Sequence, residues 1–270
     1  MAGFIPSRTL ALKFTMARNL YLLGTAGSGK TTLTHAFQTW MQSQGLDSIT
    51  VNLDPGVEDL PYAPDVDVRD WIRLDEIMEQ RGLGPNGAQI VAADLLAINA
   101  NELADVLGKF ETNYVLIDTP GQMELFTFRE SARIVIDTFG REDSALVYLN
   151  DPVLVKEPSG LVSSMLLVAT TQFRHALPFI NVLSKADLLL PEELERIVKW
   201  SLDPFALYDA LAQSEATPRM VLDTAFFESL ESIGVHKRLT PVSAEVPFGF
   251  EEIYAQVQMV FEGGEDLRPD

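Results

Sequence analysis

Residues 24–31, GTAGSGKT, constrain the fold of this chain more than any other stretch of the sequence. They match the pattern G-x-x-x-x-G-K-[ST] at every fixed position, follow the apolar run 19–23 and open a segment of helical character. In this context glycines let the backbone curl so that successive N–H groups point at phosphate oxygens, and the helix N-terminus adds positive potential. The stretch therefore predicts a phosphate-binding loop. A plain glycine-rich turn between a strand and a helix is the alternative.

The residues expected to bind the nucleotide come from this loop and from the start of the helix that follows it. They are Gly24, Ala26, Gly27, Ser28, Gly29, Lys30, Thr31 and Thr32. The Lys30 ammonium is expected on the outer phosphates, and the Thr31 hydroxyl is expected to hold Mg²⁺. The pattern thus predicts a nucleoside triphosphate bound together with magnesium.

Six short runs are expected to form β-strands. They cover residues 19–23, 49–53, 113–117, 144–150, 177–184 and 238–244. Because these runs are apolar rather than alternating, they suit strands buried on both faces, and the helical stretches between them favour a mostly parallel sheet. We predict a single α/β domain of the three-layer P-loop NTPase type, with helices on both faces.

The predicted domain covers residues 16–262. It carries a helical insert at about residues 191–235, which prolines divide into pieces. We expect an N-terminal extension, residues 1–15, and a polar tail, residues 263–270, outside the packed domain.

Composition and charge exclude several classes of protein. The 270 residues are 47% hydrophobic, and 39 acidic against 20 basic residues give a net charge of −19. A surface this acidic repels phosphate backbones and anionic lipid, so we expect neither nucleic-acid nor membrane binding. With no cysteine, disulfides and thiolate metal sites are absent. No apolar run approaches the ~20 residues that span a bilayer, and no signal peptide is evident, so we expect a cytoplasmic protein.

A second motif follows the third apolar run, in YVLIDTPGQ. An aspartate at such a strand end faces Mg²⁺ in nucleotide hydrolases, which makes Asp118 a candidate metal residue. Gly121 lets a backbone N–H approach the terminal phosphate, Gln122 can orient the attacking water, and Glu124 can accept its proton. The alternatives are a helix N-cap for Asp118 and a solvated surface acid for Glu124.

Asp54 ends the second strand and is a second candidate carboxylate for the metal and for catalysis. Its competing interpretation is local, because Asp followed by Pro55 and Gly56 is typical of an Asx-turn.

The sequence SKAD after the fifth strand predicts recognition of the base. An Asp187 carboxylate can accept two hydrogen bonds from guanine, whereas adenine offers no such pair. The stem of Lys185 would lie against the base, and Ser184 lacks the amide of the commoner asparagine. A backbone N–H of Ser243 or Ala244 can meet the guanine carbonyl. The alternative for Asp187 is a helix N-cap.

Residues 81–89, RGLGPNGAQ, form a stiff, glycine- and proline-rich interruption between two stretches that look helical. By itself this interruption predicts a turn between two helices. It also presents Gly84, Pro85 and Asn86 in sequence.

With these motifs in place the chain resembles the GPN-loop GTPases, a branch of the SIMIBI class of P-loop GTPases. The resemblance covers most of residues 17–262 and rests on GTAGSGKTT, NLDPG, GPN, DTPGQ, SKAD and VSA in that order. One departure is NLDPG, where the family usually has NLDPA. The resemblance implies a homodimer in which the loop Gly84-Pro85-Asn86 crosses the interface and Asn86 points at the partner's nucleotide.

The same resemblance implies that Asp54, Gln122 and Glu124 place the lytic water, and that Asn86 assists in trans. It implies Mg²⁺ as cofactor, with GTP as substrate and GDP as product. Eukaryotic relatives assist assembly and nuclear import of RNA polymerase, so polymerase subunits or assembly factors are expected partners. No residue of this sequence by itself indicates a polymerase contact.

Three functional classes compete at this point. A dimeric GTP-hydrolysing switch is the first, an ATPase of the deviant P-loop type is the second, and a scaffold that holds nucleotide with negligible turnover is the third. Asp187 separates the first two. Intact Lys30, Thr31, Asp118 and Gln122 argue against the scaffold. A small-molecule kinase is disfavoured because no second basic cluster awaits an acceptor phosphate.

Overall fold

The computed structural model describes residues 17–213, 218–235 and 238–262. The expected N-terminal extension, 1–15, and the expected polar tail, 263–270, lie outside the described residues.

Seven strands form one sheet in the described residues, and every neighbouring pair is parallel. The order across the sheet is β3-β2-β4-β1-β5-β6-β7. The strands are β1 (Arg18–Gly24), β2 (Ser48–Asn52), β3 (Val66–Asp67), β4 (Tyr114–Asp118), β5 (Ser144–Asn150), β6 (Phe179–Leu183) and β7 (Thr240–Pro241). The predicted P-loop NTPase fold is confirmed. The six predicted strands are all present, while the two-residue edge strand β3 was not predicted.

Helices connect the strands and cover the sheet. They are α1 (Lys30–Ser43), α2 (Leu74–Arg81), α3 (Pro85–Leu107), α4 (Met123–Thr127), α5 (Glu130–Phe139), α6 (Pro152–Val155), α7 (Pro158–His175), α8 (Pro191–Leu202), α9 (Pro204–Ala212), α10 (Pro218–Ser232) and α11 (Phe250–Glu262). Short 3₁₀ turns are η1 (Val68–Asp70), η2 (Arg141–Asp143) and η3 (Ala186–Leu188). None of the helices in the described ranges is both long and apolar enough to cross a bilayer.

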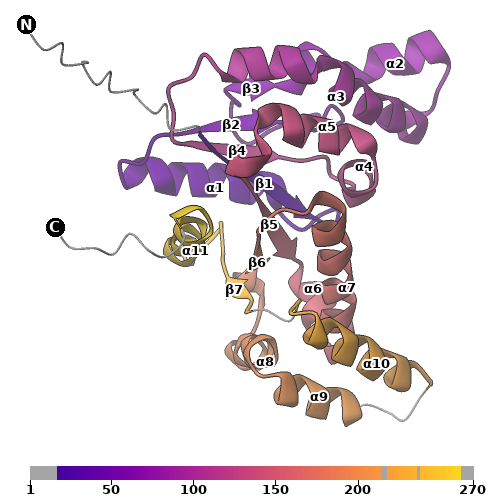
Figure 1. Cartoon of the computed structure of the whole chain (residues 1–270), viewed down its shortest axis with the longest axis vertical. Helices are drawn as coiled ribbons and strands as arrows, with labels where there is room; N and C mark the ends of the chain where they lie inside the picture. Colours follow the sequence, from indigo (N-terminus) through magenta and orange to yellow (C-terminus); the bar gives the residue numbers. More distant parts are fainter. Residues whose placement is uncertain (1–16, 214–217, 236–237, 263–270) are drawn as a thin grey trace, which may run out of the picture.

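The central strand β1 explains why the strand sequences are apolar throughout. Leu20 and Leu22 pack on one face with α1 and α11, whereas Tyr21 and Leu23 pack on the other face with α3, α5 and α7. Figure 1 shows α1 and α11 on one side of the sheet and α4, α5 and α7 on the other. Side chains that alternate along a strand therefore meet helices on both faces, which requires apolar residues at every position.

The predicted helical insert is present as α8, α9 and α10, at the lower end of the molecule in Figure 1. Helices α9 and α10 begin at Pro204 and Pro218, where a proline is tolerated because the first helical N–H has no partner within the helix. β7 is shorter than the predicted 238–244, because pairing with β6 involves only Thr240 and Pro241.

The stiff interruption is a helix–helix turn, as its composition predicts, at the upper right edge of the molecule in Figure 1. Gly82 ends α2 in the left-handed conformation, with φ 61°. Gly84 is the N-cap of α3 and Pro85 its first residue, so Asn86 belongs to the first helical turn rather than to a loop.

Candidate nucleotide-binding site

The loop between β1 and α1 has the backbone that its glycines predict. Gly24 has φ 155°, and a side chain there would place its Cβ 2.7 Å from the carbonyl oxygen of Leu149. Gly27 and Gly29 have φ 76° and 91°, a region that favours glycine. Ala26 and Gly27 are exposed, whereas the Ser28 hydroxyl is buried without a hydrogen-bond partner among the described residues.

Lys30 lies beneath this loop and is only 5% exposed. Its Nζ donates to the carbonyl oxygens of Gly24 at 3.0 Å, Thr25 at 3.1 Å and Gly121 at 3.1 Å. Burial lowers the pKa of Lys30, while Asp118 and Asp54 act in the opposite direction. Because carbonyl oxygens carry no net charge, a phosphate oxygen is a stronger acceptor for this ammonium than its present partners.

Asp118 is the last residue of β4 and is 1% exposed. Its Oδ2 accepts a 3.2 Å hydrogen bond from the Tyr62 hydroxyl, and its Oδ1 has no partner among the described residues. Burial raises the pKa of Asp118 to about 6, although Thr31, Lys30 and Tyr62 lower it. The alternative role as a helix N-cap is wrong, because Gln122 occupies that position before α4.

These residues fit a magnesium ion. The free Oδ1 of Asp118 is a buried oxygen that lacks a partner, and Thr31 lies close enough to influence that carboxylate. Within the described ranges, no group of three or more histidine, cysteine or acidic residues forms a complete metal cage. Magnesium suits such a site, since it usually takes one or two protein oxygens and completes its shell with phosphate and water.

Asp54 forms the Asx-turn of its competing interpretation, and its second carboxylate oxygen makes a long-range contact. Its Oδ1 accepts a 2.9 Å hydrogen bond from the Gly56 N–H, which is the Asx-turn. Its Oδ2 accepts a 2.8 Å hydrogen bond from the Gly121 N–H, 67 residues away. The carboxylate therefore joins the end of β2 to the DTPGQ segment, and it binds the same N–H that is expected to meet the terminal phosphate.

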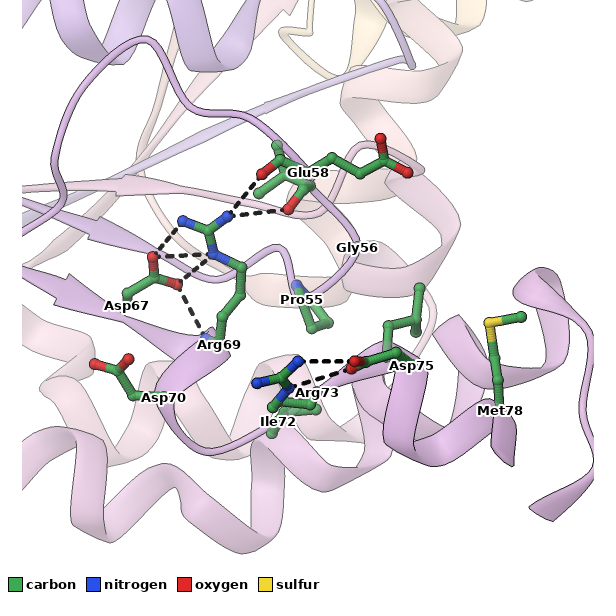
Figure 2. A pocket seen from close by; sticks show the side chains of 12 residues that line it. Pro55, Gly56, Glu58, Asp67, Arg69, Asp70, Ile72, Arg73, Asp75 and Met78 are labelled. Atoms are coloured by element: carbon green, nitrogen blue, oxygen red, sulfur yellow. Dashed lines mark hydrogen bonds and ion pairs between the residues drawn. The ribbon is translucent and has the colours of Figure 1, made fainter. Parts of the chain in front are cut away.

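The segment that follows Asp54 borders a hollow of about 630 Å³, seen in Figure 2. None of the phosphate-loop residues lines this hollow. The two arginines at its wall are paired, Arg69 with Asp67 and Arg73 with Asp75. The hollow is therefore separate from the phosphate loop.

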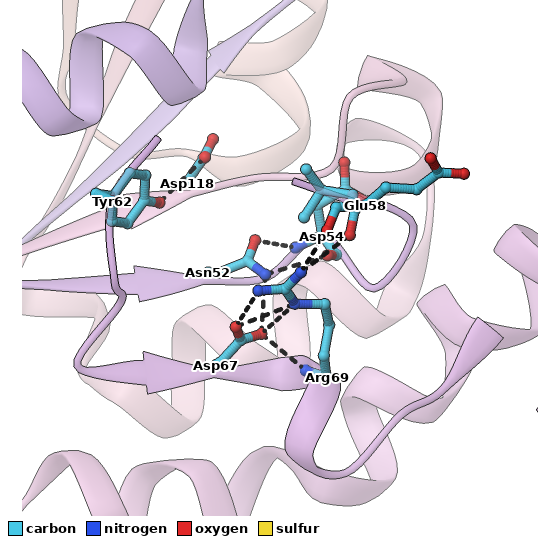
Figure 3. Close-up of polar contacts among 8 residues, drawn as sticks. Asn52, Asp54, Glu58, Tyr62, Asp67, Arg69 and Asp118 are labelled. Carbon is cyan, nitrogen blue, oxygen red and sulfur yellow. Dashed lines mark hydrogen bonds and ion pairs between the residues drawn. The ribbon is translucent and has the colours of Figure 1, made fainter. Parts of the chain in front are cut away.

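Three strands end at the same level beside the phosphate loop. Asn52 is the register partner of Asp118 on one side and of Asp67 on the other. Figure 3 shows Tyr62 reaching toward Asp118, and Asn52 between Asp54 and Asp67. Neither Asn52 nor Tyr62 was predicted as a site residue, because their roles depend on neighbours from other strands and loops.

A separate pocket of about 280 Å³ joins the phosphate loop to the predicted base-reading motif. It is lined by Ser28, Gly29, Thr32, Leu33, Ser184, Lys185, Asp187, Leu188, Val242, Ala244 and Glu245. Segments that are more than 150 residues apart in the sequence therefore line the same pocket. Asp187 lies in η3 rather than at a helix N-cap, which Lys185 occupies.

Lys185 crosses from the base-reading motif to the phosphate loop. Its backbone is left-handed, with φ 49°, an uncommon conformation for a residue other than glycine. Its Nζ donates to the carbonyl oxygen of Gly27, and to Asp151 Oδ2 at 3.1 Å. Asp151 was not predicted as a site residue, although it directly follows the buried strand β5.

The two serines expected near the base are both engaged with neighbouring backbone. Ser184 donates from its hydroxyl to the carbonyl of Asn150 at 3.2 Å. The N–H of Ser243 donates to the carbonyl of Phe248 at 3.2 Å. Of the two expected N–H donors, Ser243 is therefore occupied, and Ala244 is the one that lines the pocket.

Two of the three expected water-placing residues, Gln122 and Glu124, are exposed, whereas Asp54 is half-buried. The Gln122 side-chain amide donates to Gln89 Oε1 at 2.8 Å, which links it to α3. Gln89 carried no sequence signal. Gly84, Pro85 and Asn86 are exposed.

Comparison with known proteins agrees with this geometry. A family model described as "Conserved hypothetical ATP binding protein" matches residues 22–263. The GPN-loop GTPase PAB0955 of Pyrococcus abyssi is 39% identical over 183 residues, which cover 67% of this chain and 72% of that relative. GPN-loop GTPase 3 of Yarrowia lipolytica is 33% identical over 260 residues, which cover 93% of this chain and 94% of that relative.

Two further comparisons bear on length and fold. GPN-loop GTPase 1 of Dictyostelium discoideum is 30% identical over 227 residues, and the match spans only 56% of that longer protein. The crystal structure of PAB0955, a GTPase in its apo form, superimposes with a TM-score of 0.81 at 32% identity. That superposition covers 90% of this chain and 97% of PAB0955.

Proposed function

Because this chain belongs to the GPN-loop GTPase family, we propose that it is a Mg²⁺-dependent homodimer that hydrolyses GTP to GDP and phosphate. The enzyme class, a GTPase, follows from the family. The magnesium, the dimer and the role as a nucleotide-driven switch are the proposed parts.

One observation carries the proposal: a single pocket is lined by Ser28 and Gly29 of the phosphate loop and by Asp187. A nucleotide has its phosphates and base at opposite ends, so it needs the two recognition elements on one continuous surface. The Lys185 side chain bridges them through the Gly27 carbonyl. This arrangement supports a guanine nucleotide laid across the tip of β1.

Residues around Gly121 are proposed to recognise the terminal phosphate. The Lys30 ammonium donates to the Gly121 carbonyl, and the Gly121 N–H donates to Asp54. The ammonium and the N–H, the two donors proposed to bind the terminal phosphate, therefore lie at the same residue. Magnesium, held by Thr31 and Asp118, would neutralise charge on the outer phosphates. Asp54, Gln122 and Glu124 are proposed to orient the attacking water and to accept its proton.

The dimer is proposed from the exposed start of α3. Pro85 at the first helical position fixes the backbone before Asn86, so little ordering is needed when a partner binds. The proposal assigns Asn86 to the phosphates bound by the partner subunit. We also propose a cytoplasmic role in assembling a larger complex such as RNA polymerase. Only the family resemblance supports this part of the proposal.

The second candidate is ATP hydrolysis, which the description of the matching family model favours. Adenine cannot donate the pair of hydrogen bonds that a carboxylate at Asp187 accepts from guanine. An acceptor that a bound base buries without supplying a donor is costly, so the presence of Asp187 in the pocket favours GTP.

Phosphate release from GTP and from ATP, measured on nucleotide-stripped protein with Mg²⁺, tests the proposal. We expect kcat/KM for GTP to exceed that for ATP by roughly 100-fold or more, because hydrogen-bond readout discriminates strongly. Chelation of the metal is expected to abolish turnover. Equal use of both nucleotides would overturn guanine selection, and unchanged turnover in chelator would overturn the magnesium requirement.

A further inference from the structure

Asp54 is held from both sides of its position in the chain. On the strand side, the buried Asn52 amide accepts from the Asp54 N–H at 3.0 Å and donates to the Asp54 carbonyl at 3.2 Å. The same amide donates to Asp67 Oδ1 at 2.9 Å, which fixes its orientation. Asp67 on the edge strand β3 therefore orients the Asn52 amide that is hydrogen-bonded to the backbone of Asp54.

Arg69 holds the other side. Its Nη1 donates to the carbonyl oxygens of Val57 and Glu58, both at 3.1 Å. Its Nη2 and Nε donate to the Asp67 carboxylate, the shorter contact being 2.6 Å. Figure 3 shows the guanidinium between Asp67 and the chain that follows Asp54. One planar fork thus joins the edge strand to the loop that begins at Asp54.

The outer side of that loop faces open space, although Pro55 at its start is buried. Val57 and Glu58 border the hollow of about 630 Å³, and Figure 2 shows the Glu58 side chain extending away from Arg69. On this open side, the two hydrogen bonds from Arg69 are the side-chain contacts to the carbonyls of Val57 and Glu58.

Partial burial raises the pKa of Asp67, but hydrogen bonds from Arg69 and Asn52 outweigh it and hold the pKa below its ordinary value. The pair is therefore a charged one at neutral pH, and charged bidentate contacts are both strong and directional.

We propose that Arg69 is a positioning residue for GTP hydrolysis: through Asp67, Asn52 and the two loop carbonyls, it fixes the backbone from which the Asp54 carboxylate projects toward the Gly121 segment. This inference rests on the proposed function. The hydrogen bonds of Arg69 go to Asp67, Val57 and Glu58, and Arg69 does not line the nucleotide pocket. Its removal is therefore expected to change the alignment of Asp54 and to leave that pocket intact. It acts on turnover rather than on nucleotide affinity.

The chain offers a matched control four residues away. Arg73 lines the same hollow, but its hydrogen bonds go to the exposed Asp75. Arg69→Met removes every donor at similar length, and Arg69→Lys keeps the charge without the planar fork. Arg73→Met makes the same chemical change outside the network.

The kinetic test compares kcat, KM and GDP affinity among these variants. We expect kcat of Arg69→Met to fall by about tenfold or more, because small misalignments far from the chemistry have effects of this size. We expect KM and GDP affinity to stay within about twofold, and Arg73→Met to match the wild type. A large rise in KM together with the fall in kcat overturns the positioning role, and so does an unchanged kcat.

A second readout does not depend on catalysis. The carbonyl of the Glu58–Asp59 bond is one that Arg69 holds, so glutamyl endopeptidase should cleave the nucleotide-free chain after Glu58 faster in Arg69→Met. Cleavage after Glu111, an exposed glutamate elsewhere, is the internal reference. Faster cleavage at Glu58 alone supports the role of Arg69 in holding the loop after Asp54, which we call the Arg69 clamp. Equal cleavage in all variants overturns this role.

The two readouts also separate this inference from the proposed function. If the wild type neither binds nor hydrolyses GTP while Glu58 cleavage responds to Arg69, the proposed function fails and the clamp is only structural. If Arg69→Met does not fold by circular dichroism, Arg69→Lys carries both tests. For Arg69→Lys we expect a smaller kcat loss in the same direction, and wild-type values for both readouts overturn the proposal.

Discussion

The N–H of Gly121 donates to Asp54 Oδ2 at 2.8 Å, so a carboxylate occupies the acceptor position expected for the terminal phosphate. A phosphate oxygen and a carboxylate cannot both take this N–H at close range, because two anions repel. Binding of a triphosphate should therefore release Asp54 Oδ2, whereas a diphosphate leaves the contact in place. If the proposed site holds the nucleotide, we expect this contact to distinguish GTP from GDP.

Asp54→Asn tests this relationship. The amide can still close the Asx-turn, but it is a weaker acceptor for Gly121 and a poor base. We expect kcat to fall by about 100-fold or more, with GDP affinity within about threefold. Asp59→Asn, an exposed change in the same loop, is the control. Wild-type turnover in Asp54→Asn would remove Asp54 from the catalytic residues.

Asp187→Asn should change the preferred base. An asparagine at this position can pair with xanthine, whose carbonyl replaces the guanine amine, so we expect kcat/KM to shift from GTP toward xanthosine triphosphate by roughly 100-fold. Competition between the two nucleotides in one assay measures the shift. The exposed Asp209→Asn is expected to keep the wild-type preference, and unchanged GTP selectivity in Asp187→Asn would refute guanine reading.

Turnover per subunit should rise with protein concentration, because Asn86 is proposed to act on the partner's nucleotide. Asn86→Ala should flatten this rise and lower the plateau by about 100-fold or more, the usual effect of losing one hydrogen-bond donor to the transition state. Asn101→Ala, on the exposed surface of the same helix, is the matched control. A wild-type curve that is flat across the monomer–dimer transition contradicts action in trans.

His175 predicts a pH dependence of stability. Burial lowers its pKa to about 4, and neither ring nitrogen has a hydrogen-bond partner within the described residues. In the unfolded chain the imidazole of His175 takes up a proton near pH 6.5, whereas in the folded chain it does so only near pH 4. The free energy of unfolding should therefore fall as the pH drops from about 6.5 to 4, and the effect of His175 on it should level off below that. Relative to His175→Gln, the loss should be about 1–3 kcal/mol by denaturant titration. Parallel profiles for both proteins would contradict this.

The central part of the site could be predicted because each signal is local. Apolar runs that lead into Asp54 and Asp118 imply a shared sheet edge, and the structure has the last residue of β2, Asn52, in register with Asp118. The glycine spacing of the phosphate loop specifies its own backbone. The turn before α3 was likewise evident from its glycines and proline, although only the structure assigns Asn86 to a helix.

The supporting residues could not be predicted, because their roles depend on distant parts of the chain. Asp151 meets Lys185 across 34 residues, and Gln89 meets Gln122 across 33. β3 has only two residues, too few for a periodic signal, and it is this strand that brings Asp67 to Asn52. Arg69 in turn has a role only once that strand exists.

Isothermal titration calorimetry of nucleotide-stripped protein tests the central claim most directly. A non-hydrolysable GTP analogue with Mg²⁺ should bind to one site per subunit, and the matching ATP analogue should bind at least about 100-fold more weakly. Absence of binding heat with the guanine analogue at several temperatures, on protein that is folded by circular dichroism, would contradict the account. Equal affinity for the two analogues would contradict the assignment of Asp187.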